Sequence, residues 1–246
     1  MRYLILFLFV TTANAQIWVL DSGYNPVPQI TNVGKMESFD ETYGEDCIGH
    51  GTYVTSLLAR KLPDAYIISH KVSQNWGGCN TPTIYDSSRV RMSLYWLGLG
   101  QSRGDIVLWA SSLGTGNCAG EINEELEEAV EFATSRGVIF VAASGNDNCH
   151  ISNFSPTRMS QVLVIGATDS LSRRGTDILY SSKNQLGYKK DGSIHVSSTG
   201  GTSYAVPNAV ADLHQACIDW EPYCTTHTVQ EIVDGFKYLY RNNMLN

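Results

Sequence analysis

Short unbroken runs of apolar residues alternate along this chain with stretches that carry apolar side chains at helical spacing. The runs predict buried strands, because a strand covered on both faces is apolar throughout; they occupy residues 17–20, 66–72, 106–110, 138–143 and 162–167. The helical stretches are residues 50–61, 86–97, 121–136, 203–218 and 228–240. This alternation predicts an α/β fold of three layers, in which a mostly parallel sheet carries helices on both faces.

The stretch 121–136 is the most regular of the predicted helices. Leu126, Val130 and Ala133 recur on one face, and Gly137 follows as a stop signal. We expect the acidic residues within this stretch to form a solvated face.

Composition places the chain among ordinary globular proteins; its length alone would allow two domains, but α/β enzymes of this size are commonly single domains, and we expect one. It has 246 residues, of which 43% are hydrophobic, enough to bury one substantial core. The formal net charge is -7 and lysine and arginine do not cluster, so we expect no nucleic-acid partner. The sequence contains no internal repeats and no low-complexity tracts.

The first fifteen residues have the pattern of a secretory signal. Arg2 supplies a short positive region, Leu4 to Val10 form an apolar run, and Ala13-Asn14-Ala15 is the small-x-small pattern that precedes cleavage. We therefore expect residues 1–15 to be removed and residues 16–246 to form one secreted domain, extracellular or periplasmic. The apolar run is too short to span a bilayer and no later stretch is longer, so we expect no membrane association after cleavage.

Cysteines in a secreted chain favour disulfide bonds. The six lie at Cys47, Cys79, Cys118, Cys149, Cys217 and Cys224. Cys217 and Cys224 are close enough in sequence to staple a loop. A metal site built from Cys47-x-x-His50 and Cys149-His150 is the alternative, but the chain lacks a second CxxC pair.

Four short segments carry residues suited to nucleophilic catalysis. They are Asp21-Ser22-Gly23 at the end of a predicted strand, Gly49-His50-Gly51-Thr52-Tyr53-Val54 at a predicted helix start, Ala142-Ala143-Ser144-Gly145-Asn146 where a strand breaks, and Gly200-Gly201-Thr202-Ser203-Tyr204-Ala205-Val206-Pro207. The first three are ordinary turn or loop sequences when taken alone. The fourth is more specific, because a serine at a helix start has a backbone N–H that is unsatisfied and directed at incoming negative charge.

Taken together and in this order, the four segments resemble the motifs of the subtilisin-like serine proteases (subtilases). The family carries Asp-Ser/Thr-Gly, His-Gly-Thr-x-Val, Ala-x-Gly-Asn and Gly-Thr-Ser-x-Ala-x-Pro, and the likeness extends from about residue 17 to 215. The chain order Asp, His, Ser differs from that of the α/β-hydrolases, and Ala205 breaks their Gly-x-Ser-x-Gly motif.

The resemblance implies a role for each residue. Ser203 would be the nucleophile, His50 the general base and Asp21 the group that orients the imidazole. Asn146 and the backbone N–H of Ser203 would hold the oxyanion.

The resemblance also implies a peptide-binding cleft. Ser112, Leu113 and Gly114 are similar to a segment that lines this cleft in the family, where a substrate adds as an extra strand. Ala143, Ser144 and Gly145 are expected to contact the substrate as well.

The resemblance bears on the remaining cysteines too. Cys47 and Cys79 match a spacing found in some disulfide-bearing members. Cys118 and Cys149 each follow a strand, and these strands would be neighbours in the family's fold, which favours a second bridge.

The sequence departs from the family in two regions. Only Gln16 to Leu20 separate the expected cleavage site from Asp21, which leaves no recognisable propeptide. The stretch after Tyr180 is short and lacks the usual Ala-Pro-Gly. The chemistry requires no cofactor and no metal ligand; structural calcium is left open, because no calcium site can be assigned from a motif. We expect a monomer that acts on protein or peptide substrates.

Two other functions fit parts of the sequence. One is a secreted subtilase-fold binding protein that has lost turnover. The missing propeptide favours this function, whereas the presence of all four polar residues, Asp21, His50, Asn146 and Ser203, argues against it. The other is an adhesion or structural domain, which would require repeats or exposed apolar stripes that the sequence does not contain.

Overall fold

The structure is a computed structural model. It describes residues 15–36, 45–74, 79, 84–100, 103–111, 118–167, 173, 178–181, 186–188, 194–196, 201–242 and 244. The expected signal segment, apart from Ala15, therefore lies outside the described residues.

The described strands form one large sheet and two small ones. The large sheet has seven strands in the order β2-β3-β1-β6-β7-β8-β9, and every neighbouring pair is parallel. Its strands are β1 (Ile17–Asp21), β2 (Val33–Met36), β3 (Ile67–Lys71), β6 (Ile106–Trp109), β7 (Ile139–Ala143), β8 (Leu163–Ala167) and β9 (Ile178–Ser181). The small sheets are antiparallel and pair β4 (Ser73–Gln74) with β5 (Ile84–Tyr85), and β10 (Leu186–Tyr188) with β11 (Ile194–Val196).

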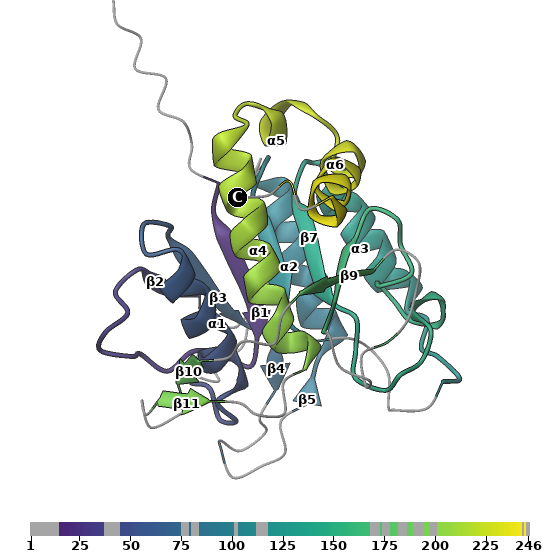
Figure 1. The fold of residues 1–246 in the computed structure, drawn as a ribbon. Helices are drawn as coiled ribbons and strands as arrows, with labels where there is room; N and C mark the ends of the chain where they lie inside the picture. Colours follow the sequence, from purple (N-terminus) through teal and green to yellow (C-terminus); the bar gives the residue numbers. More distant parts are fainter. Residues whose placement is uncertain are drawn as a thin grey trace, which may run out of the picture.

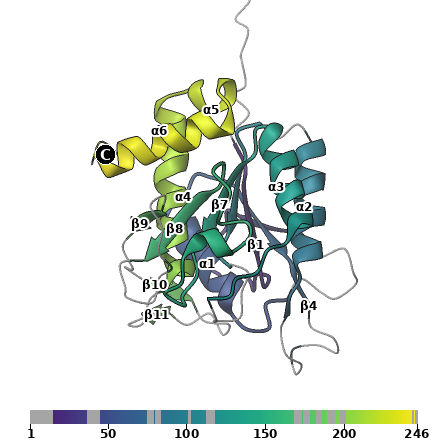
Figure 2. The same ribbon diagram turned by 90° about the vertical axis from the view of Figure 1, so that its right-hand side faces the viewer.

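Helices cover both faces of the large sheet. They are α1 (His50–Lys61), α2 (Ser87–Leu99), α3 (Glu124–Ser135), α4 (Thr202–Asp219), α5 (Tyr223–Thr226) and α6 (Val229–Arg241), with a short 3₁₀ turn at Ile151–Asn153. Figure 1 shows α4 in front of the sheet and α2 and α3 behind it, and the turned view in Figure 2 separates the layers. The predicted three-layer α/β architecture is confirmed.

The alternation of side chains along β1 explains why both faces need a cover. Ile17 and Val19 join the apolar core beneath α1 and α4, whereas Trp18 and Leu20 join the core beneath α2 and α3. All four are buried, as expected for a parallel strand inside the sheet.

The order of the strands fixes the place where a site can form. After β1 the chain forms β2 and β3 on one side of it, and the later strands β6, β7 and β8 follow on the other side. The carboxyl ends of strands beside such a reversal leave a crevice in which α/β proteins bind ligands. Asp21 stands at this end of β1 and Ala110 follows the end of β6.

The helix expected over 121–136 begins later than predicted. The Asn123 side chain caps it by accepting the Leu126 N–H at 2.9 Å. Glu121 lies outside the helix and forms an isolated bridge with Phe154.

Glu124, Glu125, Glu128 and Glu131 are exposed, as expected for a solvated face, and Glu127 is the exception. Glu127 binds the Arg158 guanidinium at 2.6 and 2.8 Å, in a two-point ion pair.

The three disulfides are Cys47–Cys79, Cys118–Cys149 and Cys217–Cys224. These are the pairings that the sequence and the family resemblance favoured. Cys47 and Cys149 are thus oxidised, which excludes the alternative of a thiolate metal site with His50. Among the described residues, no group of three or more histidine, cysteine or acidic side chains is placed to hold a metal ion.

Candidate active site

Asp21 is fully buried at the end of β1 and receives several hydrogen bonds on one oxygen. Its Oδ1 accepts from the Ser22 backbone N–H at 2.7 Å, is 2.7 Å from His50 Nδ1, and accepts from the Tyr85 hydroxyl at 3.1 Å. The other oxygen, Oδ2, is buried without a hydrogen-bond partner in the described structure. The imidazole, the Ser22 N–H and the Tyr85 hydroxyl therefore share a single carboxylate oxygen.

His50 is the first residue of α1, and the loop before it is held by Asp46. The buried Asp46 carboxylate accepts backbone N–H groups from Ile48, Gly49 and Thr52, at 3.2, 2.8 and 2.7 Å. These bonds satisfy donors that a helix start leaves unpaired. The His50 ring is positioned by this turn.

A close approach of two backbones brings His50 to Asp21. A Cβ atom added to Gly51 would lie 2.3 Å from the carbonyl oxygen of Gly23 and 3.1 Å from the Asp21 Cβ. The glycine after His50 is therefore required by the contact between α1 and the end of β1.

Two opposing effects act on the pKa of His50. Burial disfavours the charged imidazolium, whereas the charge and hydrogen bond of Asp21, with a smaller contribution from Asp46, favour it. The balance raises the pKa of His50 above its ordinary value. Because Nδ1 faces Asp21, Nε2 is the nitrogen left to take up a proton from another group.

Ser203 is the second residue of α4. The helix begins after Gly201, whose backbone is extended, and the Ser203 N–H is one of the early donors that lack a partner within the helix. The Ser203 hydroxyl donates to the backbone carbonyl of Ala110 at 2.6 Å. Within the described residues this carbonyl, and not the His50 imidazole, is the partner of the hydroxyl.

Asn146 lies beside the start of α4 with its carboxamide oriented. Its Oδ1 accepts the Thr202 backbone N–H at 2.9 Å. A planar amide held through its oxygen directs its NH₂ group the other way, where it can donate. Gly145, with a φ of 105°, makes the turn that presents Asn146 after β7.

Of the two segments expected to contact substrate, the structure describes the one at the end of β7. Ala143 and Ser144 are buried at the end of β7, and the Ser144 N–H is bound to the Ile165 carbonyl at 2.9 Å. The Gly145 carbonyl accepts the backbone N–H of Arg173 at 3.0 Å. Ser112, Leu113 and Gly114 lie outside the described residues.

Two contributors to this site were not predicted from the sequence. Asp46 was overlooked because a lone acid in a loop has no pattern, although Asp46 three residues before Gly49 is the spacing of a side-chain cap. Tyr85 was overlooked because its partners are 64 and 35 positions away in the chain.

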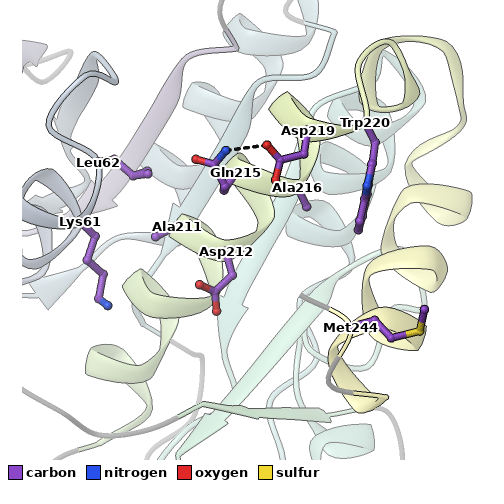
Figure 3. Close-up of a pocket in the computed structure, with 9 residues that line it drawn as sticks. All are labelled: Lys61, Leu62, Ala211, Asp212, Gln215, Ala216, Asp219, Trp220 and Met244. Atoms are coloured by element: carbon purple, nitrogen blue, oxygen red, sulfur yellow. Dashed lines mark hydrogen bonds between the residues drawn. The ribbon is translucent and has the colours of Figure 1, made fainter. Parts of the chain in front are cut away.

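A separate pocket of about 630 Å³ lies away from these residues, between the end of α1 and the C-terminal half of α4 (Figure 3). Burial raises the pKa of Asp212, which Lys61 opposes, and Gln215 donates to Asp219 at 2.8 Å. The described residues that line the pocket are Lys61, Leu62, Ala211, Asp212, Gln215, Ala216, Asp219, Trp220 and Met244. They include none of the catalytic residues expected from the sequence.

Comparison with known proteins relates most of the chain to one family. A model described as the subtilase family matches residues 17–232. Subtilisin Savinase from Lederbergia lenta is 30% identical over 219 residues, which cover 81% of this chain and 74% of the relative. The minor extracellular protease Epr from Bacillus subtilis is 29% identical over 220 residues, covering 82% of this chain and 32% of Epr.

Two further matches define the extent of the likeness. An alkaline protease from Alkalihalobacillus alcalophilus is 30% identical over 219 residues, 81% of this chain and 53% of that protein. The chain thus spans about half or less of this relative and of Epr. Among solved structures, a cold-adapted subtilisin-like serine proteinase superposes with a TM-score of 0.74 at 21% identity, covering 89% of this chain and 80% of the other.

Proposed function

Since the chain belongs to the subtilase family, we propose that it is a secreted serine endopeptidase in which Asp21, His50 and Ser203 form the catalytic triad. The observation that carries the proposal is the buried Asp21 carboxylate, 2.7 Å from His50 Nδ1 at the carboxyl end of the sheet. An imidazole held in this way exposes Nε2 as a base of raised pKa, which is what a serine nucleophile requires.

In this mechanism Ser203 Oγ attacks the carbonyl carbon of the peptide bond while its proton passes to His50 Nε2. The negative charge that develops on the carbonyl oxygen is stabilised by the Asn146 NH₂ group and the Ser203 N–H. His50 then delivers the proton to the departing amine, leaving an acyl group on Ser203. Water attacks this ester by the same route in reverse, and the carboxylic acid is released.

The hydrogen bond from Ser203 to Ala110 fits the resting state of such a mechanism. Rotation of the serine side chain would exchange the Ala110 carbonyl for the His50 imidazole as the acceptor. Hydrogen bonds between catalytic groups are often long or absent before substrate binds. A substrate strand that pairs beside the end of β6 would compete for the same carbonyl.

Secretion is part of the proposal. The residues before Ala15 have a signal pattern, and three disulfides are typical of a protein that folds in an oxidising compartment. Among the described helices, none has both the length and the apolar character needed to cross a bilayer.

Labelling with a fluorophosphonate probe tests the proposal directly. The probe forms a covalent bond only with an activated serine, so we expect the secreted protein to be labelled at Ser203 and to cleave a denatured protein library. Ser203→Ala should abolish both, and His50→Ala should reduce hydrolysis by about 10⁴-fold or more. Secretion of both variants at normal yield is the control for folding.

The alternative is a binding protein without turnover. It predicts a correctly secreted and folded wild type that neither reacts with the probe nor cleaves any peptide of the library. Labelling at a serine other than Ser203, which survives Ser203→Ala, would contradict the assigned nucleophile.

A further inference from the structure

The Tyr85 hydroxyl contacts both members of the pair formed by Asp21 and His50. It lies 3.1 Å from Asp21 Oδ1 and 3.3 Å from His50 Nδ1, and the two rings are nearly perpendicular, with centroids 6.4 Å apart. The proposed peptide hydrolysis does not itself require the Tyr85 hydroxyl.

Donor and acceptor roles in this triangle can be assigned by chemistry. An ionised carboxylate can only accept, so the Tyr85 O–H donates to Asp21. The Nδ1–H is directed at Oδ1, which is 2.7 Å away, whereas the phenol oxygen is 3.3 Å from Nδ1, so the phenol acts on the imidazole through the carboxylate oxygen that they share. The Asp21 contact favours the tautomer that places the proton on Nδ1 and leaves Nε2 bare, and the Tyr85 hydroxyl helps to hold the accepting oxygen in place.

We propose that Tyr85 is a positioning residue that fixes the tautomer of His50 and lowers its proton affinity by sharing the charge of Asp21. A phenol that donates to Oδ1 competes with the imidazolium for the same oxygen. Its bond to the carboxylate is strongest when the imidazole is neutral and the negative charge is uncompensated. The proposal rests on the function proposed above, because it assigns a role within the same site.

The backbone holds Tyr85 where this role requires it. Tyr85 pairs with Ser73 across the β4–β5 hairpin, and the next residue, Asp86, caps α2 by accepting the Ser88 N–H at 2.8 Å. The Asp86 N–H is bound to the Val72 carbonyl at 3.2 Å. Hydrogen bonds therefore fix the chain on both sides of the tyrosine.

Other groups around His50 complete its electrostatic environment. Asp46 in the loop before α1 also favours the imidazolium, and the Tyr204 ring from α4 has its centroid 6.1 Å from that of His50. Burial and the neighbouring Asp21 charge raise the pKa of Tyr85 well above its ordinary value, so its hydroxyl stays protonated. Tyr85 acts as a fixed donor throughout the working pH range.

Tyr85→Phe is the variant that tests the proposal, because it keeps the ring and removes the hydroxyl. We expect the pKa of His50 to rise by about 0.5–1 unit, so the acid limb of kcat/KM moves to higher pH by the same amount. We expect kcat to fall by about 3- to 10-fold with little change in KM. Tyr238→Phe, at an exposed position on α6, is the matched control and should change none of these.

The pKa of His50 should also be measured by NMR titration of the imidazole, with His50→Gln to assign the signal. This readout does not depend on turnover. A wild type that fails to react with fluorophosphonate would contradict the proposed function, while the NMR titration would still decide the effect of Tyr85. An unchanged His50 pKa in a folded Tyr85→Phe protein overturns the proposal, even if the variant is less stable.

Incorporation of 3-fluorotyrosine at position 85 gives a second test that keeps the hydroxyl and nearly the same shape. The fluorinated phenol is a stronger donor, so we expect the pKa of His50 to fall below that of the wild type. The opposite shifts of the two substitutions would establish the phenol as the cause. A rise or no change with fluorotyrosine would overturn the proposal independently of how Tyr85→Phe folds.

Discussion

The orientation of the Asn146 side chain follows from a single hydrogen bond. Its oxygen is bound to the Thr202 N–H, so the NH₂ group is the part available to a ligand. The same contact fastens the turn after β7 to the first turn of α4. Substitution at this position therefore removes the acceptor for the Thr202 N–H together with the NH₂ group.

Two substitutions of Asn146 separate these effects. Asn146→Ala should lower kcat by about 10²–10³-fold and leave KM nearly unchanged, because an oxyanion donor acts in the transition state. Asn146→Asp keeps an oxygen that can accept the Thr202 N–H but lacks the NH₂ donor, so its kcat should fall as much as that of Asn146→Ala. Steady-state kinetics on a peptide substrate measure both, with Asn242→Ala at the end of α6 as the control. Recovery of kcat in Asn146→Asp would assign Asn146 to structure instead.

The identities of the site residues could be predicted from motifs, but their contacts could not. Asp21, His50, Asn146 and Ser203 each stand in a short, distinctive segment. The bond from Ser203 to the Ala110 carbonyl depends on a side-chain rotamer, which no sequence pattern encodes. The catalytic roles themselves remain predictions that the experiments above address.

At the level of elements, α1 depends on a carboxylate that lies outside it. Asp46 binds three backbone N–H groups around the helix start and also accepts the Ser22 hydroxyl at 2.8 Å. This arrangement joins the beginning of α1 to the end of β1. Asp46 therefore holds both the start of α1 and the end of β1, where Asp21 lies.

Asp46→Asn should weaken this anchor without changing its size. An amide oxygen is a poorer acceptor than a carboxylate, and the NH₂ group of asparagine cannot accept the N–H groups that Asp46 binds. We therefore expect the free energy of unfolding to fall by about 1–3 kcal/mol. Urea denaturation followed by circular dichroism measures the change. The exposed Asp64→Asn is the control. Equal stability of the two variants would contradict the capping role of Asp46.

The strands that could be predicted are those buried on both faces. β3, β6, β7 and β8 fall within the expected apolar runs, β1 extends one residue past its run to Asp21, and α1 has the expected bounds. β2 (Val33–Met36) was not predicted, because it is an edge strand whose residues are half-buried or exposed and whose Gly34-Lys35 interrupts any apolar run. β4 and β5 have two residues each, too few for a period to be seen.

For the whole molecule, the buried histidines make stability depend on pH. Burial lowers the pKa of His70, on β3, from 6.5 to about 4, and lowers that of His214, on α4. Between pH 6.5 and pH 4, His70 binds a proton in the unfolded chain but stays neutral in the folded protein. The free energy of unfolding therefore falls as the pH decreases from about 6.5 to about 4.

Because the pKa of His70 is about 4 in the folded protein and 6.5 ordinarily, His70 alone should account for about 3 kcal/mol of this loss. Urea midpoints measured between pH 7 and pH 4 give the slope. His70→Asn, which does not titrate, should have a shallower slope than the wild type. Parallel slopes for wild type and His70→Asn would show that folded His70 binds its proton as readily as the unfolded chain does.

The Cys47–Cys79 and Cys118–Cys149 disulfides would affect the resistance of an endopeptidase to cleavage by other molecules of the same protein. Cys47 lies three residues before His50, and Cys149 lies three residues after Asn146, so each bridge begins in a loop that borders the site. An endopeptidase at high concentration is exposed to self-digestion, and its surface loops are the natural targets. A single nick between Cys47 and Cys79, or between Cys118 and Cys149, leaves both new ends covalently attached to the body of the protein. Autolysis would then require two cuts or a reductant before a fragment could leave.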